Sequence, residues 1–368
     1  MKGEVDRIIT TACFLLLMLC CQLTFAQSAS PYSRYGLGDI SSTVFSANKA
    51  MGGVAAPYTS SININYTNPA SYAFLTRTTV ELGANFGGTK IMTKDSIYRG
   101  GNAGVSHFAV AFVPNPKHNN WAIAMGLLPY TNINYTFIQN YNDTAAKGIY
   151  QEVFNGNGSL YQAFAGGAYR VKCFSIGANV GFLFGKLDYV KTITFPDSVA
   201  AYSTSNVTTM NVKSFIYNVG VQYQKRIFHS SNDPDARNDI YVTVGAYGSS
   251  GIKMHAKISN YWERFDVVNS VTTIVDTIEG TFNTKGTITL PFNVGGGIMF
   301  GNERFWMLGA DYRFANWQDY SSPLNNGGLV NSWRVSIGGQ ITPRYDDTRK
   351  FFNRVNYRLG GYFGKSEI

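Results

Sequence analysis

Cysteine is scarce in this chain of 368 residues, which contains only four. Cys13, Cys20 and Cys21 lie in an apolar N-terminal run that we expect to be removed, so the remaining chain keeps only Cys173. A single thiol forms neither an intrachain disulfide nor a cysteine metal cluster. We expect Cys173 to begin a strand as a small apolar packing residue.

Long apolar runs are missing after the N-terminus, which excludes a helical membrane span beyond that point. The N-terminal run extends over residues 8–25, follows Lys2 and Arg7, and ends just before Ala26. This pattern predicts a cleaved secretory signal peptide over residues 1–26. Acidic residues dilute its basic start, which leaves an uncleaved anchor as the alternative.

Catalytic and metal-binding motifs are also missing. The four histidines, His107, His118, His229 and His255, are far apart and lack the spacing of a metalloprotease motif. The chain has no Gly-x-Ser-x-Gly elbow and no phosphate loop. A dispersed serine and histidine site, as in a lipase, remains the alternative. We predict that the protein is not an enzyme and uses no cofactor and no metal.

What the chain does contain is a period-two alternation of large apolar residues with small or polar ones. In residues 306–314 one face carries Trp306, Leu308, Ala310, Tyr312 and Phe314, and the other carries Met307, Gly309, Asp311 and Arg313. Segments 80–86, 176–185, 215–224 and 333–341 repeat it. Successive strand side chains point to opposite faces, so one face suits lipid and the other water. The pattern predicts an all-β chain folded as a transmembrane antiparallel β-barrel, with a soluble sandwich as the alternative.

Turn-forming residues divide the barrel, residues 76–368, into about eleven strands. We expect them near 76–92, 103–114, 119–138, 148–170, 172–195, 206–229, 238–262, 286–301, 303–320, 331–344 and 352–365. Several exceed the roughly ten residues that cross a membrane, so their hairpins should project beyond it. The short turns at 171–172 and 301–303 would lie on the periplasmic side, and the links 197–206 and 266–284 outside.

Charge is sparse and mixed, although the formal net charge is +9. Lysine and arginine are scattered without a basic run, and an exported β-rich chain rarely meets nucleic acid. We therefore expect no nucleic-acid partner. The partners that fit the positive charge are anionic groups of outer-membrane lipid or an anionic solute.

Residues 27–75 have a different character, rich in small residues, asparagine and proline and without alternation. They contain Ala50-Met51-Gly52-Gly53-Val54-Ala55, and then Asn68-Pro69-Ala70 directly ahead of a strand. Here the chain resembles the FadL/TodX family of outer-membrane hydrophobic-compound transporters, whose N-terminal hatch carries such segments. Its opening, residues 30–38, resembles Bacteroidetes-type members, and residues 308–313 and 333–338 are similar to the family's later strands.

The resemblance implies a barrel of about fourteen strands that encloses an N-terminal hatch, residues 27–75, with Asn68, Pro69 and Ala70 as the hatch motif. The strand pattern stops near eleven at residues 364–368. Bacterial single-chain barrels use even strand numbers and close because an unpaired edge cannot face hydrocarbon. We therefore expect that the chain is truncated and that roughly three strands are missing at its C-terminus, with a miscount as the alternative.

The function that the resemblance implies is passive uptake of hydrophobic or amphipathic, fatty-acid-like small molecules across the cell outer membrane. The alternative is a scaffold or attachment subunit that works with proteins of a secretion system. Occupancy of the lumen separates the two roles. A transporter should hold an apolar ligand there, whereas a scaffold should show a filled lumen and an exposed apolar patch.

Inward-facing charges form the sharpest local hypothesis. Three late strands contribute Asp311, Arg313, Arg334 and Arg358, and an early strand contributes Glu81. Buried charges need partners. One interpretation is that the excess of arginine binds the carboxylate of an amphipathic substrate. The other is that Glu81 and Asp311 pair with these arginines and fasten the hatch to the wall.

Overall fold

The structure is a computed structural model. It describes residues 30–92, 97–115, 120–143, 148–195, 202–229, 239–268, 271–324 and 328–368. The expected signal peptide, His118 and residues 197–201 of the link 197–206 lie outside these residues. None of the described helices is both long and apolar enough to cross a membrane.

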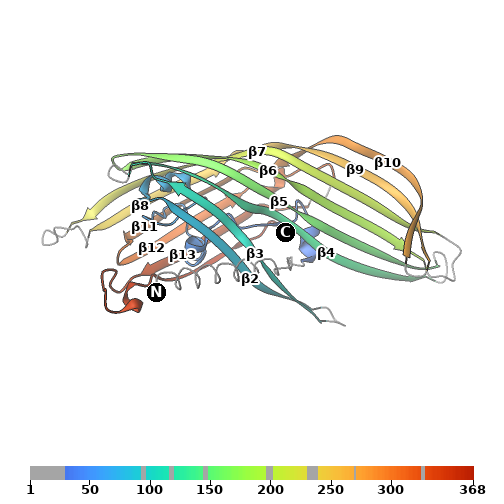
Figure 1. The fold of residues 1–368 in the computed structure, drawn as a ribbon, viewed down its shortest axis with the longest axis horizontal. Coiled ribbons are helices and arrows are strands. Elements are labelled where there is room, and N and C mark those ends of the chain that lie inside the picture. The colour runs from blue at the N-terminus through green and yellow to red at the C-terminus, as the bar shows by residue number, and fades with distance from the viewer. Residues whose placement is uncertain are drawn as a thin grey trace, which may run out of the picture.

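The described chain is almost entirely antiparallel β-sheet, which confirms the predicted fold class (Figure 1). The long strands are β2 (Thr79–Met92), β3 (Ile97–Phe112), β4 (Trp121–Asp143), β5 (Gly148–Val171), β6 (Phe174–Thr194), β7 (Ser203–Phe228), β8 (Ile240–Ser249), β9 (Ile252–Val268), β10 (Val271–Leu290), β11 (Asn293–Asn302), β12 (Trp306–Ala315), β13 (Ser332–Ile341) and β14 (Tyr357–Lys365). A two-residue strand, β1 (Asp39–Ile40), pairs with β4 from inside.

Neighbouring strands follow one another in the order β14-β13-β12-β11-β8-β7-β6-β5-β4-β3-β2, a path of eleven. Strands β9 and β10 continue β8 and β11, because the pair Ser249 and Asn293 is followed by the pair Ile252 and Leu290. The continuous strands formed by β8 with β9 and by β10 with β11 are therefore interrupted at the same level. There Pro291 lacks the backbone N–H that a β-ladder needs. The expected number of about eleven is confirmed for the path around the sheet.

Some predicted boundaries are wrong. The expected outer link 266–284 is the paired end of β9 and β10. The prediction missed it because threonine and acidic residues there hide the alternation. The strand expected over 303–320 ends at Ala315, and a 3₁₀ helix, η4 (Trp317–Asp319), follows. The strand expected from 352 begins at Tyr357, after another 3₁₀ helix, η5 (Phe351–Arg354).

The sheet is not closed. In the described part of the chain β2 pairs only with β3, and β14 pairs only with β13. The predicted absence of about three strands beyond residue 368 stays a prediction.

The two faces of the wall differ as the alternation predicts. Along β6, Ile176, Val180 and Phe182 are exposed on the outer face, whereas Asn179 and Leu183 are buried on the inner face. Exposed apolar side chains of the same kind lie on β7, β11, β12 and β13, including Phe215, Val219, Ile298, Leu308 and Ile337. This apolar exterior is what a lipid-facing band requires.

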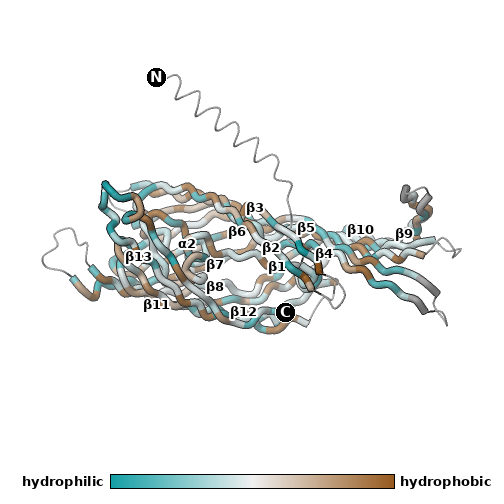
Figure 2. The backbone as a smooth tube through the Cα atoms, turned by 90° about the horizontal axis from the view of Figure 1, so that it is seen from below, coloured by the Kyte–Doolittle hydropathy of each residue, from teal (hydrophilic) through white to brown (hydrophobic). Residues whose placement is uncertain are grey.

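Residues 30–75, which we call the N-terminal segment, lie inside the curved sheet (Figure 2). They form three short helices: η1 (Pro31–Arg34), α2 (Ser46–Lys49) and η2 (Pro69–Phe74). Tyr58, Tyr72 and Met51 of this segment are fully buried. Beyond the segment, the long strands enclose an apolar core that includes Leu160, Leu187, Met210, Met254 and Ile288.

A row of inward glycines allows the wall to approach the backbone of the N-terminal segment. We call these residues the glycine belt; seven successive strands of the path contribute Gly177, Gly220, Gly245, Gly297, Gly309, Gly338 and Gly360. A Cβ at Gly245 would overlap Ala56, and one at Gly338 would overlap Met51. The segment is therefore docked largely backbone against backbone, which no larger residue permits.

The belt makes a stability prediction. Gly245→Ala should loosen or destabilise the docked segment by about 1–3 kcal/mol, the usual effect of overpacking a filled interior. The matched control is Gly296→Ala on the partner strand, where the nearest atom to an added Cβ is 3.6 Å away. Limited proteolysis of residues 51–59 and the midpoint of heat-induced gel-shift report the change. Equal behaviour of the two variants would contradict close docking.

Candidate functional site in the lumen

Three carboxylates of the wall hold the N-terminal segment through its backbone amides. Asp311 Oδ2 accepts hydrogen bonds from the amides of Ala55 at 3.0 Å and Ala56 at 2.6 Å. Glu81 Oε2 accepts one from the amide of Ile64 at 3.0 Å. These bonds to ionised acceptors are stronger than neutral ones. The two predicted acidic residues thus contact the segment through its amides rather than through arginine.

Glu303 is the third of these carboxylates, and the sequence pattern did not single it out. It accepts hydrogen bonds from the hydroxyl of Ser60 at 2.5 Å and the amide of Ser61 at 2.8 Å. It lies in the short turn after β11, where alternation says nothing about side-chain direction. Only the position of the segment reveals its role.

The predicted hatch motif lies at the start of η2. Asn68 is the N-cap residue, and its side-chain oxygen accepts from the amide of Ala70 at 3.2 Å. The side-chain amide of Asn68 donates to the carbonyl of Ala56 at 2.6 Å. Pro69 occupies the first turn of the helix, where its missing N–H is no loss. Asn68 and Pro69 fit against Gly220 and Gly177 of the belt.

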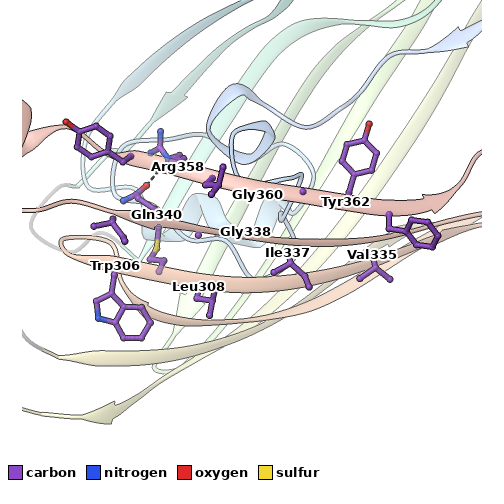
Figure 3. Close-up of a pocket in the computed structure, with 16 residues that line it drawn as sticks. Trp306, Leu308, Val335, Ile337, Gly338, Gln340, Arg358, Gly360 and Tyr362 are labelled. Atoms are coloured by element: carbon purple, nitrogen blue, oxygen red, sulfur yellow. Dashed lines mark hydrogen bonds between the residues drawn. The ribbon is translucent and has the colours of Figure 1, made fainter.

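Arg358 belongs with the residues that hold the N-terminal segment. Its Nε donates to Gln340 Oε1 at 2.8 Å, and its terminal nitrogen lies 3.4 Å from Asn63 Oδ1 (Figure 3). Of the five predicted charges, Glu81, Asp311 and Arg358 therefore contact the segment directly.

Arg313 and Arg334 have different surroundings. They are opposite each other across β12 and β13, and both line a cavity of about 730 Å³ at the end of the wall where β14 finishes. The Arg334 guanidinium lies 4.3 Å from the centre of the Tyr362 ring. Among the ion pairs of the described residues, none involves either arginine. Asp39 and Glu367 line the same cavity, so the two neighbouring cations share it with two carboxylates.

A smaller cavity of about 100 Å³ lies deeper in the lumen, between the N-terminal segment and the wall. The two cavities share four lining residues: Ile40, Ser41, Arg313 and Trp317. Arg313 and Trp317 therefore lie where the larger cavity meets the smaller one. The pair combines a cation with a large apolar surface.

The histidines do not form a metal site within the described residues, which contain no group of three potential ligands. His107 is buried with its ring stacked on Phe45 at 3.8 Å between centroids. His229 Nδ1 lies 2.7 Å from Asp239 Oδ1.

Asp239 lies just before β8 and joins the turn region of two strands. Its carboxylate is fully buried and contacts Arg226 at 3.0 Å as well as His229. Burial alone would raise its pKa, but hydrogen bonds from His229 and Arg226 hold the pKa of Asp239 below its ordinary value of 3.8.

Taken together, the fold is a curved antiparallel β-sheet of FadL type with the N-terminal segment inside it. The chain belongs to the BamG family, because the family model described as BamG matches residues 7–368. A search of curated proteins gave no match.

Solved structures with a similar fold include a Pseudomonas aeruginosa FadL homologue, at 14% identity and a TM-score of 0.55 over 90% of this chain and 82% of that one. They also include the P. putida toluene transporter TodX, at 15% identity and a TM-score of 0.50 over 88% of this chain and 84% of that one. At this identity the likeness establishes the fold.

The anchoring carboxylate of β12 provides a second prediction. Asp311→Asn removes the negative charge that accepts two backbone amides, so the N-terminal segment should lose about 1–3 kcal/mol of docking free energy. Faster proteolysis at residues 54–58 measures this loss. Asp276→Asn, which neutralises an exposed carboxylate of β10, is the matched control. Unchanged proteolysis of the Asp311 variant would show that the segment is held without this contact.

A third prediction concerns acid stability. Because the pKa of Asp239 is lowered in the folded state, the unfolded state binds more protons at low pH. The stabilisation is complete above pH 3.8 and is lost as the pH falls through the lowered value. Asp239→Asn should be less stable at neutral pH and show a flatter decline in acid. Unfolding midpoints measured from pH 7 to pH 2 test this, with Asp276→Asn expected to follow the wild type.

Proposed function

We propose that the protein is an outer-membrane channel for passive uptake of hydrophobic or amphipathic small molecules, with a carboxylate-bearing, fatty-acid-like ligand fitting best. The observation that carries this proposal is the junction of the two cavities at Arg313 and Trp317. A cation beside an indole ring suits a ligand that has an anionic head and an apolar tail.

The ligand would enter the larger cavity first. There its carboxylate would meet Arg313 and Arg334, neither of which has an ion-pair partner in the described wall, and its tail would lie along Trp317 and Ile40. The inner cavity of about 100 Å³ is too small for such a tail. Passage therefore requires the N-terminal segment to shift, and no covalent chemistry occurs.

The structural relatives support a hydrophobic ligand. TodX is described as a toluene transporter, and its structure aligns with 88% of this chain. The apolar exterior of the wall supports an outer-membrane location, because those side chains would otherwise face water.

A second role, as an attachment subunit for other membrane or secretion proteins, is favoured by the filled lumen. An apolar core that includes Leu37 of the N-terminal segment occupies part of the interior, and an apolar concavity of about 920 Å³ lies over β12, β13 and β14. A filled interior together with an exposed apolar surface is the combination expected of a scaffold.

Binding of dodecanoate and of dodecanol to the purified full chain tests the channel. Arg313→Gln with Arg334→Gln should weaken dodecanoate binding about tenfold or more, since each charge-assisted bond contributes about 1.5–3 kcal/mol. Dodecanol binding should change little. Arg99→Gln, an exposed arginine of β3, is the control.

Uptake of dodecanoate into vesicles that contain the protein completes this test. If the wild type neither binds nor transports either compound, the channel proposal fails and the attachment role gains support. If both compounds are affected equally by the arginine substitutions, the arginines do not recognise a carboxylate.

A further inference from the structure

The end of the wall that carries the short turns, which we call the short-turn end, is rich in exposed cations. They come from the β5–β6 turn, the end of β7, the β11–β12 turn and the loop between β13 and β14. They include Lys172, Lys225, Arg304, Arg349, Lys350 and Arg354. None of the ion pairs between described residues involves any of them. At the opposite end of the sheet, the β9–β10 hairpin mixes lysines with Asp266, Asp276 and Glu279 (Figure 1).

The carboxylates of the short-turn end are mostly engaged by the chain itself. Asp239 is fully buried in its ion pairs, and Glu303 binds the N-terminal segment. Asp347 accepts hydrogen bonds from two amides of the β13–β14 loop, at 2.9 and 3.1 Å. Asp346 is the exposed carboxylate of this loop. The described acidic residues of this end therefore neutralise only part of its positive charge.

A row of aromatic side chains on the outer face lies just inside these cations. The row consists of Trp121, Tyr169, Phe174, Tyr223, Trp306 and Tyr357. Trp121 and Tyr169 are opposite each other across β4 and β5, and the rings of Phe174 and Tyr223 are 4.7 Å apart. Lys225 lies two residues beyond Tyr223 on β7. Aromatic rows of this kind mark the interface between lipid tails and headgroups on a membrane-spanning wall.

A second aromatic row on the outer face gives the position of the opposite interface. It includes Tyr161, Phe184, Phe314 and Trp333. Phe174 and Phe184 belong to the two rows and are ten residues apart on β6. At about 3.3 Å per residue and a strand tilt of about 40°, this separation spans about 25 Å, the height of a lipid-facing band. The cations of the short-turn end therefore lie at the depth of the lipid headgroups.

The loop between β13 and β14, residues 342–356, adds an apolar tip at the same end. Its own hydrogen bonds order it, since the side-chain amide of Asn353 donates to Asp347 Oδ2 at 2.5 Å. Phe351 and Phe352 of η5 are nevertheless 66% and 73% exposed. Three cations of the loop flank them in the sequence: Arg349, Lys350 and Arg354. Aromatic side chains beside lysine and arginine are typical of a segment that lies in a membrane interface.

We propose that the cations of the short-turn end bind the headgroup phosphates of anionic glycerophospholipids, while Phe351 and Phe352 enter the acyl layer. This inference rests on the proposed outer-membrane location. The leaflet would be the periplasmic one, because we expect the short turns on that side. Charge complementarity favours an anionic headgroup. The cations are spread over four turn regions at one depth, which suits a lipid leaflet better than the compact surface of a protein.

Fluorescence quenching with the full chain in vesicles tests the proposal. A nitrobenzoxadiazole fluorophore is attached to Phe352→Cys in a Cys173→Ser background. The bilayer contains equal amounts of phosphatidylcholine and phosphatidylglycerol, of which one carries brominated acyl chains. We expect brominated phosphatidylglycerol to quench about threefold or more as strongly as brominated phosphatidylcholine. The preference should disappear in 1 M salt, where the Debye length is about 3 Å.

Two triple variants identify the cations that recognise the headgroups. The first neutralises the cations of the loop: Arg349→Gln, Lys350→Gln and Arg354→Gln. The matched control neutralises exposed cations of β9 and β10: Lys253→Gln, Lys257→Gln and Lys285→Gln. The first should abolish the lipid preference and the control should keep it, with the heat-induced gel-shift confirming that both variants fold. The opposite pattern, or a preference that survives in the first variant, would overturn the proposal.

The remaining outcomes also decide. Equal quenching by both lipids in the inserted wild type would overturn recognition of an anionic headgroup. Absence of quenching would mean that the loop lies in water, where an acidic protein would be its partner instead of lipid. Loss of dodecanoate uptake with an intact lipid preference would refute the channel alone, and the converse would refute this inference alone. Failure of the chain to enter vesicles would refute both.

Discussion

The structure depends on satisfying the backbone of a segment enclosed within a wall. Residues 30–75 have little regular secondary structure, so their N–H and C=O groups need partners from elsewhere. The wall supplies them from inward side chains. Asp311 and Glu81 accept from amides, while Gln222 donates to the carbonyl of Ala56 at 2.8 Å and Asn179 to that of Tyr66 at 3.2 Å. Glycine lets wall and segment come close enough for these bonds to form.

This arrangement explains why the inner charges divide into two groups. Asp311 and Arg313 are neighbours on the same face of β12; Asp311 accepts hydrogen bonds from the segment, whereas Arg313 lines the cavities beside it. Arg313 lies two residues further along the strand, where the two cavities meet. Position along the strand, rather than charge, decides whether an inward residue holds the segment or faces open space.

Much of this architecture follows from the sequence. Period-two alternation predicted the all-β wall and the path of about eleven strands. A strand with one apolar outer face and one polar or small inner face must alternate these residue types along the sequence. The break near Pro291 and the paired strands over 266–284 were not predicted. Threonine-rich strand ends that project beyond the wall have no apolar face to cover, so they need no alternation.

The site was predicted less completely. The inward direction of Asp311, Arg313, Arg334 and Arg358 follows from alternation, but the contacts of each depend on where an irregular segment crosses the lumen. No periodicity encodes that crossing. Glu303 was missed for the same reason, and most of the glycine belt was not anticipated because single glycines spread over seven strands have no common spacing.

The strand pairs β8–β9 and β10–β11 are interrupted at the same level, which divides the wall into two parts. We call the part with β8 and β11 the lower part and the part with β9 and β10 the upper part. The lower part carries the glycine belt and the three carboxylates that bind the N-terminal segment. In the upper part, within the described residues, the β9–β10 hairpin pairs with the rest of the sheet through the first half of β7 and a single bridge from Thr289 to Ser321. Insertions at the far end of that hairpin would leave the three carboxylate contacts in place, whereas changes at Met254 or Ile288 would reach Leu37 of the N-terminal segment through the shared apolar core. The β9–β10 hairpin is therefore the part of the wall that the anchoring carboxylates depend on least.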